Sequence, residues 1–161
     1  EVLLRAWPEI VRRAPRVQLL CFGQGPLGAR LERLAARHDL TAHVRFVGFR
    51  DDFPRLLPGL DVLVHPAARE GLGLVVLEAM AAGVPVVATA VGGIVDAVTD
   101  GVEGLLVAAG DGPGLVASIE RLLDSPAERA RMGAAARARV EREFSIPRMA
   151  DRYSELYRNV H

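Results

Sequence analysis

Two glutamates with seven residues between them, Glu70 and Glu78, are the side chains in this sequence best placed for chemistry. They bracket a glycine-containing turn, Gly71-Leu72-Gly73, and the apolar residues after it predict a helix that begins near Leu74. Glu78 falls about two turns into that helix, at ~3.6 residues per turn. Carboxylates placed at a turn and on a helix can accept hydrogen bonds from the hydroxyl groups of a polyol.

Glu78 is predicted to lie on the same helical face as three apolar residues. Leu74, Leu77 and Ala81 share with it the i, i+3, i+4, i+7 spacing of one face of a helix. We therefore expect this face to point toward the core. A carboxylate beside a core-facing stripe is costly unless something hydrogen-bonds to it, and a diol offers two hydroxyl donors.

The turn itself predicts an anion site. Gly71 and Gly73 let backbone come close to a ligand. The free N–H groups of Leu72, Gly73 and Leu74 would point from the helix N-terminus at an anion, and phosphate fits such a site. Glu70 would repel that phosphate if it were aimed at it, so we expect its carboxylate to face neutral hydroxyl groups elsewhere.

The stretch Glu70–Ala88, EGLGLVVLEAMAAGVPVVA, resembles the E-x7-E signature of retaining glycosyltransferases with the GT-B fold, the "glycosyltransferases group 1" family. The resemblance continues through Gly92-Gly93 and Asp100–Gly104 downstream and Gly23–Pro26 upstream, so it covers nearly the whole chain. Leu72 departs from the family, which usually carries Phe there. The departure changes a packing residue and leaves the backbone donors intact.

This resemblance implies that residues 1–161 form the C-terminal, donor-binding domain of an enzyme that moves a sugar from a nucleotide-sugar to an acceptor hydroxyl with retention at the anomeric carbon. It implies a catalytic role for Glu70, which would hydrogen-bond the donor sugar, and contact of Glu78 with the ribose hydroxyls. The amides of Gly71, Leu72, Gly73 and Leu74 would stabilise the departing diphosphate. An N-terminal domain would carry the acceptor site, so we expect this chain to be inactive alone.

Each of these assignments has a simpler structural alternative. Glu70 could be a favourable charge near a helix N-terminus, and Glu78 could pair with an arginine. Gly23 and Gly25 either line the nucleotide pocket or form an ordinary strand-to-helix turn. Phe49 either contacts the base or lies on a surface turn.

Two other kinds of protein remain as alternatives at this point. One is a non-catalytic Rossmann-type module that binds a nucleotide or a partner. The other is a different GT-B enzyme, such as a sugar-nucleotide epimerase. A phosphorylase of this fold would carry a site lysine for pyridoxal phosphate, and the sequence contains no lysine.

Composition narrows the partners. The 161 residues carry 20 basic and 20 acidic side chains, and zero net charge argues against nucleic acid as a main partner. The histidines lack metal-ligand spacing, and His65 is most simply a strand-end residue near the cleft. Asp51-Asp52 is not a D-x-D metal pair, so we expect neither a metal nor another cofactor. Cys21 is the only cysteine, which fits a reducing compartment. With no run of about 18 apolar residues, we expect a cytoplasmic protein. Peripheral contact with the inner face of the membrane, through the N-terminal domain, and a glycan or lipid-linked acceptor are further expectations.

Apolar runs alternate with helical patterns, which predicts a doubly wound parallel sheet of the Rossmann type. Predicted strands cover Arg16–Phe22, Val44–Val47, Asp61–His65, Val84–Thr89 and Leu105–Val107. We expect Arg16–Phe22 to be a buried strand, and the β-branched, apolar segment Val84–Thr89 (VPVVAT) to be a central parallel strand. Predicted helices cover Glu1–Ala14, Leu27–His38, Asp51–Leu57, Leu74–Gly83, Gly93–Val98, Asp111–Asp124, Pro126–Arg142 and Ser145–Asn159. Arginines alternate with Glu and Ala from Ala127 to Glu143, which predicts a solvated helix face. We expect Pro8 to kink or break the first helix.

The strand order of this fold predicts a gap. In the order 3-2-1-4-5-6 the first strand is central, but this chain begins in the helix that would follow it. The resemblance implies that this strand carries an arginine and a lysine that grip the diphosphate. We therefore expect no direct pairing between the Arg16–Phe22 and Asp61–His65 strands. The resemblance also implies that the last helix returns toward the N-terminal domain. Without that domain, part of the face formed by Tyr153, Leu156 and Tyr157 should be exposed.

Overall fold

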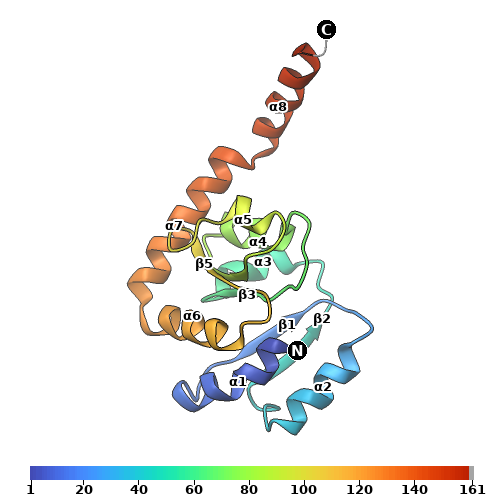
Figure 1. The fold of residues 1–161 in the computed structure, drawn as a ribbon, viewed down its shortest axis with the longest axis vertical. Helices are drawn as coiled ribbons and strands as arrows, with labels where there is room; N and C mark the ends of the chain where they lie inside the picture. Colours follow the sequence, from blue (N-terminus) through green and yellow to red (C-terminus); the bar gives the residue numbers. More distant parts are fainter. Residues whose placement is uncertain (160–161) are drawn as a thin grey trace.

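The structure is a computed structural model and describes residues 1–159. Strands and helices alternate along the chain (Figure 1), as the apolar pattern predicts. In order, the elements are α1 Val2–Arg13, β1 Leu19–Phe22, α2 Gly28–Arg37, β2 Val44–Gly48, α3 Phe53–Leu56, the 3-10 helix η1 Leu57–Gly59, β3 Leu63–His65, α4 Leu74–Ala81, β4 Val86–Thr89, α5 Ile94–Ala97, β5 Gly104–Val107, α6 Gly112–Asp124, α7 Pro126–Glu143 and α8 Ile146–Asn159.

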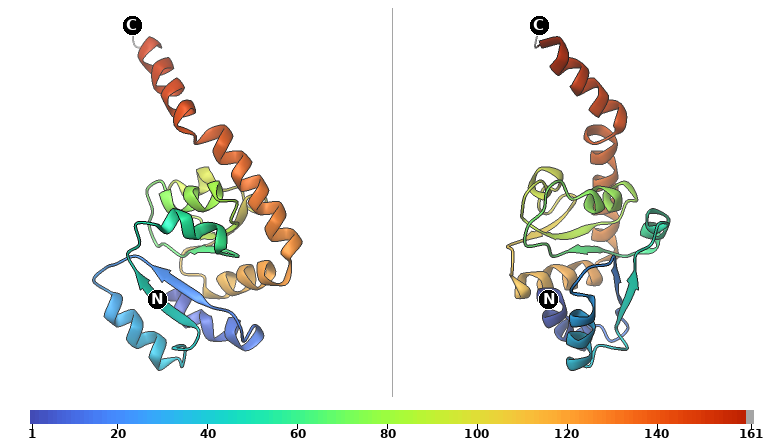
Figure 2. Two further views of the ribbon diagram at one scale, coloured as in Figure 1. Left: turned by 180° about the vertical axis from the view of Figure 1, so that it is seen from behind. Right: turned by 90° about the vertical axis from the view of Figure 1, so that its right-hand side faces the viewer.

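The strands form two separate parallel sheets. One pairs β1 with β2, and the other has the order β3-β4-β5. Within the described residues β1 and β3 do not pair, so the predicted gap between these strands is confirmed. Figure 2 shows the two sheets as distinct layers of strands, with β1 and β2 below the β3-β4-β5 sheet.

The two sheets differ in how completely they are covered. All four residues of β4 are buried, which confirms that the VPVVAT segment supplies the central strand of its sheet. The run from Arg16 to Phe22 was expected to form a buried strand, but β1 has no fully buried residue and Leu20 is 36% exposed. This prediction was wrong because burial of a central strand needs a neighbour on both edges, and β1 has one.

Helix α1 runs unbroken from Val2 to Arg13 with Pro8 inside it. The expectation of a kink or break at Pro8 is therefore wrong as to the break. Packing explains the outcome, because Leu4, Trp7 and Ile10 are buried and the helix lies against α6. The contact is extended at the surface by Arg13, which bonds Glu120 and Asp124 of α6 at 2.8 and 2.5 Å.

Helix α7 packs against α4 and α6, and α8 continues beyond its end as an arm that leaves the body of the molecule (Figure 1; Figure 2, right). The apolar face of α8 is open: Tyr153, Leu156 and Tyr157 are 56%, 58% and 70% exposed, as expected. Among residues 1–159 no helix combines the length and apolar character needed to cross a bilayer.

Candidate functional site

The segment between β3 and α4 carries Glu70 and is fixed at both ends. Leu63, Val64 and His65 pair with β4, which places the end of β3 beside Thr89. Thr89 is 1% exposed, and its hydroxyl donates to the carbonyl of Ala67 at 2.5 Å. Sequence reasoning missed Thr89, because a threonine at a strand end is common and its partner lies 22 residues away. The start of the loop is thereby anchored to the central strand of the sheet.

Glu70 engages both of its carboxylate oxygens. Oε2 lies 2.9 Å from His65 Nε2, and Oε1 accepts the backbone N–H of Gly71 at 2.9 Å. The hydrogen bond from His65 holds the pKa of Glu70 below its ordinary value, and the backbone N–H groups of Gly71 and Gly73 act in the same direction. The carboxylate is therefore ionised at neutral pH.

This geometry assigns one of the loop amides to Glu70. Its carboxylate lies against the first of them, that of Gly71. A carboxylate is purely an acceptor when ionised, so the nearest N–H groups attract it. The Gly71 amide is thus occupied by Glu70, and the amides of Leu72 and Leu74 are the ones left for an external acceptor.

The N-terminus of α4 has the geometry of an anion site. Gly73 precedes the helix in the left-handed conformation, with φ 74°, and its carbonyl accepts the N–H groups of Val76 and Leu77. Within residues 1–159, the N–H groups of Leu72 and Leu74 donate to no protein acceptor. The side chains of these two leucines are 49% and 66% exposed, so ligand atoms can reach the amides.

Glu78 lies on a different face of α4 from the one expected. Val76, Ala79 and Met80 are the residues that face the core, whereas Leu74 and Glu78 are exposed. The expectation of a core-facing stripe through Glu78 is therefore wrong. Leucine, valine and alanine occur all around this helix, so spacing alone could not select the buried face. Because Glu78 is exposed, its carboxylate needs no ligand to compensate for burial, and it is accessible to one.

The glycine pair Gly92-Gly93 packs directly against the backbone of Glu70 and Gly71. The N–H of Gly93 donates to the carbonyl of Gly71 at 2.6 Å. A Cβ at position 92 would lie 1.9 Å from the Glu70 carbonyl oxygen, and one at position 93 would lie 2.6 Å from that of Gly71. Only glycine permits this approach, so the pair sets the height of the loop above the start of α5.

Arg139 on α7 donates hydrogen bonds to α5 and to the segment that follows it. Arg139 donates to the carbonyl of Asp96 at 2.9 Å, to Thr99 Oγ1 at 2.5 Å and to Glu103 Oε2 at 3.3 Å. Glu103 also accepts the N–H of Thr99 at 2.8 Å. Sequence reasoning treated the arginines of this helix as a solvated face, but the side chain of Arg139 is only 17% exposed.

The other predicted site residues belong to the β1-β2 sheet. Gly23 has φ 106° and donates its N–H to the carbonyl of Gly48 at 2.8 Å, which joins the ends of the two strands. Gly25 has open space around it, and Phe49 is 70% exposed. The loops after β1 and β3 emerge on the same side of the molecule (Figure 1, right). Within residues 1–159, however, no hydrogen bond joins Glu70 to Gly23, Gly25 or Phe49.

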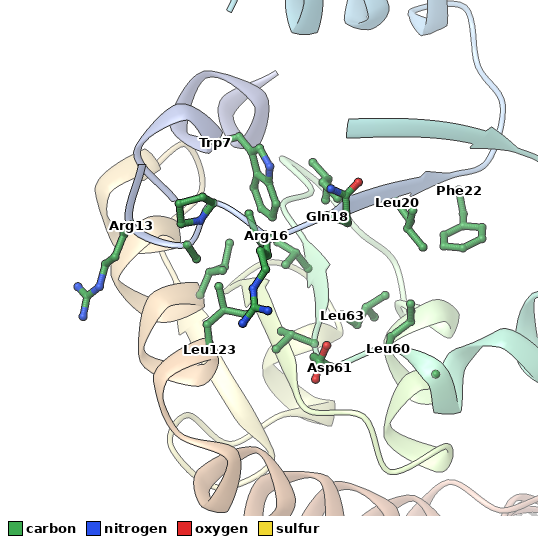
Figure 3. A pocket seen from close by; sticks show the side chains of 18 residues that line it. Trp7, Arg13, Arg16, Gln18, Leu20, Phe22, Leu60, Asp61, Leu63 and Leu123 are labelled. Carbon is green, nitrogen blue, oxygen red and sulfur yellow. The ribbon is translucent and has the colours of Figure 1, made fainter. Parts of the chain in front are cut away.

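A groove of about 740 Å³ follows the gap between β1 and β3 (Figure 3). Figure 3 shows Trp7, Leu20, Phe22 and Leu63 along its walls. None of the predicted site residues lines this groove. It is the space beside two strand edges rather than the candidate site.

Comparison with known proteins agrees with this architecture. A family model described as "Glycosyl transferases group 1" matches residues 1–139. A GDP-mannose-dependent monoacylated alpha-(1-6)-phosphatidylinositol monomannoside mannosyltransferase from Corynebacterium glutamicum is 39% identical over 163 residues, which cover 96% of this chain and 42% of the relative. The chain thus spans less than half of the length of that protein.

Solved structures match across the same span. HepE from Anabaena, in complex with UDP, has a TM-score of 0.91 at 27% identity, covering 98% of this chain and 44% of HepE. Sucrose-phosphate synthase from Thermosynechococcus elongatus has a TM-score of 0.86 at 35% identity, covering 99% of this chain and 41% of the synthase. The chain therefore belongs to the glycosyl transferases group 1 family, and its fold is that of the C-terminal Rossmann-like domain of GT-B glycosyltransferases.

Proposed function

We propose that this chain is the nucleotide-sugar-binding domain, residues 1–161, of a glycosyltransferase that transfers a sugar to an acceptor hydroxyl with retention of anomeric configuration. Family membership supports a sugar transferase. The names of two relatives supply the substrate class: HepE was crystallised with UDP-glucose, and the Corynebacterium enzyme is GDP-mannose-dependent. The observation that carries the proposal is the ionised carboxylate of Glu70, each of whose oxygens makes a hydrogen bond. It lies beside the backbone N–H groups of Leu72 and Leu74, which have no protein acceptor within residues 1–159.

Each part of the site takes one part of the donor. Glu70 accepts hydrogen bonds from the sugar hydroxyls, and Glu78 accepts those of the ribose. The amides at the start of α4 receive the diphosphate, and Gly73 gives the chain the conformation that exposes them. Gly23, Gly25 and Phe49, at the ends of β1 and β2, line the side of the nucleotide.

The amides at the start of α4 also serve the reaction. Negative charge grows on the diphosphate as the bond to the sugar breaks, and N–H groups that are already oriented stabilise that charge without reorganisation. No metal ion or cofactor takes part in this proposal. The acceptor, a glycan or a lipid-linked molecule, binds to a part of the protein outside this chain, so residues 1–161 alone give no turnover.

The proposal is tested by calorimetric titration of the complete gene product with UDP, UDP-glucose, GDP and GDP-mannose. We expect one nucleotide-sugar to bind more tightly than its bare diphosphate. Glu70→Ala should abolish that preference, and Glu78→Ala should weaken both ligands. Glu9→Ala is the matched control, because Glu9 is a 58% exposed glutamate on α1.

Other outcomes favour the alternatives. If neither Glu70→Ala nor Glu78→Ala changes binding, the chain is a non-catalytic nucleotide or partner-binding module. If a nucleotide-sugar binds and is isomerised rather than transferred, the protein is a sugar-nucleotide epimerase. Turnover that disappears with EDTA and returns with Mg²⁺ would refute metal independence. Recovery of the protein away from both the cytoplasm and the inner face of the membrane would refute the cytoplasmic location expected from the sequence.

A further inference from the structure

His65 and Glu70 form a contact between a rigid element and a loop. His65 is the last residue of β3, where its backbone is paired with Ala88 of the central strand. Glu70 lies five residues later, in the segment before α4. The atoms His65 Nε2 and Glu70 Oε2 are 2.9 Å apart, and the two side chains are 21% and 28% exposed.

The chemistry of this contact assigns its direction. An ionised carboxylate can only accept, so Nε2 of His65 carries the proton and donates. The other oxygen of Glu70 is held by the N–H of Gly71. Two contacts from two directions fix the plane of the carboxylate, and they occupy two of its roughly four lone-pair sites. The remaining sites are available to hydroxyl groups of a ligand.

We propose that His65 is a positioning residue for Glu70, which sets the orientation of the carboxylate for the hydroxyls of the donor sugar. This inference rests on the proposed function of Glu70. In this role His65 acts through Glu70 rather than by contact with the donor. Its replacement should therefore reduce the preference for a nucleotide-sugar over its bare diphosphate, and leave the affinity for the diphosphate unchanged.

Two variants separate the hydrogen bond from the packing. His65→Phe keeps a planar ring and removes the donor. His65→Gln places an amide N–H at a similar reach and keeps it. Glu70→Ala gives the value of the preference when the carboxylate is absent, and the double variant His65→Phe/Glu70→Ala shows whether the histidine acts through Glu70.

The measurement is calorimetric titration of the complete gene product with UDP-glucose and GDP-mannose, each against its bare diphosphate. We expect His65→Phe to lower the preference about tenfold, as for loss of a hydrogen bond to a charged group. His65→Gln should retain most of the preference. The double variant should bind like Glu70→Ala, and diphosphate affinity should stay within about twofold in all of them.

The outcomes distinguish this inference from the proposed function. If Glu70→Ala abolishes the preference and His65→Phe leaves it intact, the role of His65 is refuted and that of Glu70 stands. If Glu70→Ala is silent, both are refuted. If His65→Phe weakens nucleotide-sugar and diphosphate equally, or His65→Gln fails to rescue, His65 merely supports the fold and the inference is overturned.

Discussion

At the scale of single residues, the ionisation of Glu70 couples the site to stability. His65 and the Gly71 amide lower the pKa of this carboxyl group, so the contact adds stability above the pKa of an unfolded glutamate, about 4.3. That contribution is lost as the pH falls through the lower folded pKa. We expect Glu70→Gln to melt below the unaltered protein at pH 5, and the difference to close at more acidic pH. Thermal unfolding by circular dichroism over a pH series measures this, and a difference that widens in acid would contradict it.

The close packing of Gly92 against the backbone of Glu70 predicts a second effect, on both stability and donor binding. Gly92→Ala introduces a Cβ 1.9 Å from the Glu70 carbonyl oxygen at a residue with φ 51°. Left-handed backbone costs alanine about 1–2 kcal/mol, and relief of the contact adds about 1–3 kcal/mol. We expect the displaced loop to lose its preference for the nucleotide-sugar as well. Denaturant unfolding and calorimetric titration report the two effects.

Gly110→Ala is the control for the backbone term. Gly110 has φ 84°, and a Cβ there meets nothing within 4 Å. It should therefore lose about 1–2 kcal/mol of unfolding free energy and bind normally. Equal losses of stability in the two variants, with donor preference kept in both, would show that the contact with Glu70 does not matter.

The sequence predicted most of these residues, but not their contacts. Glu70, Gly73 and Gly92 occur in a motif with local spacing, so their place at a turn and a helix N-terminus could be read directly. The hydrogen bond between His65 and Glu70 depends on the path of the four residues between them, which residue types do not specify. For this reason His65 was interpreted as an ordinary strand-end residue.

At the scale of elements, Arg139 connects α7 to the short helix that supports the loop. Its partner Glu103 is 5% exposed, so removing the arginine leaves a buried carboxylate without its ion pair. Such a loss costs about 3–5 kcal/mol. We expect Arg139→Met to lower the free energy of unfolding by this amount, measured in denaturant, and Arg139→Met/Glu103→Gln to recover part of it.

Arg137→Met on the same helix is the matched control. Arg137 is 61% exposed and its contact with Glu141 is 3.7 Å, so its removal should change stability by less than about 0.5 kcal/mol. A similar loss from both substitutions would mean that helix α7 responds to any change of charge, and that the contacts of Arg139 with α5 are not what stabilises the molecule.

Element identity was predictable, while element burial was not. Apolar runs and glycine turns located every strand to within a few residues, because those signals are local. The buried face of α4 could not be read, because apolar residues occur all around that helix. The hydrogen bonds of Arg139 to α5 and Glu103 could not be predicted either, because these partners lie 36 to 43 residues away in the sequence.

At the scale of the whole molecule, the two sheets are separated by a groove between strand edges. The absence of pairing between β1 and β3 was predictable from the strand order of the recognised fold, since it depends on topology rather than on side chains. The groove has an apolar wall and includes the buried indole of Trp7, whose Nε1 has no partner in the described part of the chain. Unpaired strand edges and a buried donor of this kind favour the addition of another extended segment.

Hydrogen exchange of the 161-residue chain tests the state of these edges. The N–H groups of Leu19 and Leu63 bond to neighbouring strands, at 2.8 and 3.0 Å. Since N–H direction alternates along a strand, those of Leu20 and Val64 point into the groove. We expect Leu20 and Val64 to exchange about tenfold or more faster than Leu19 and Leu63, because solvent reaches them without unfolding. Equal protection of all four amides would show that the two sheets close on each other in solution and that the groove is not open.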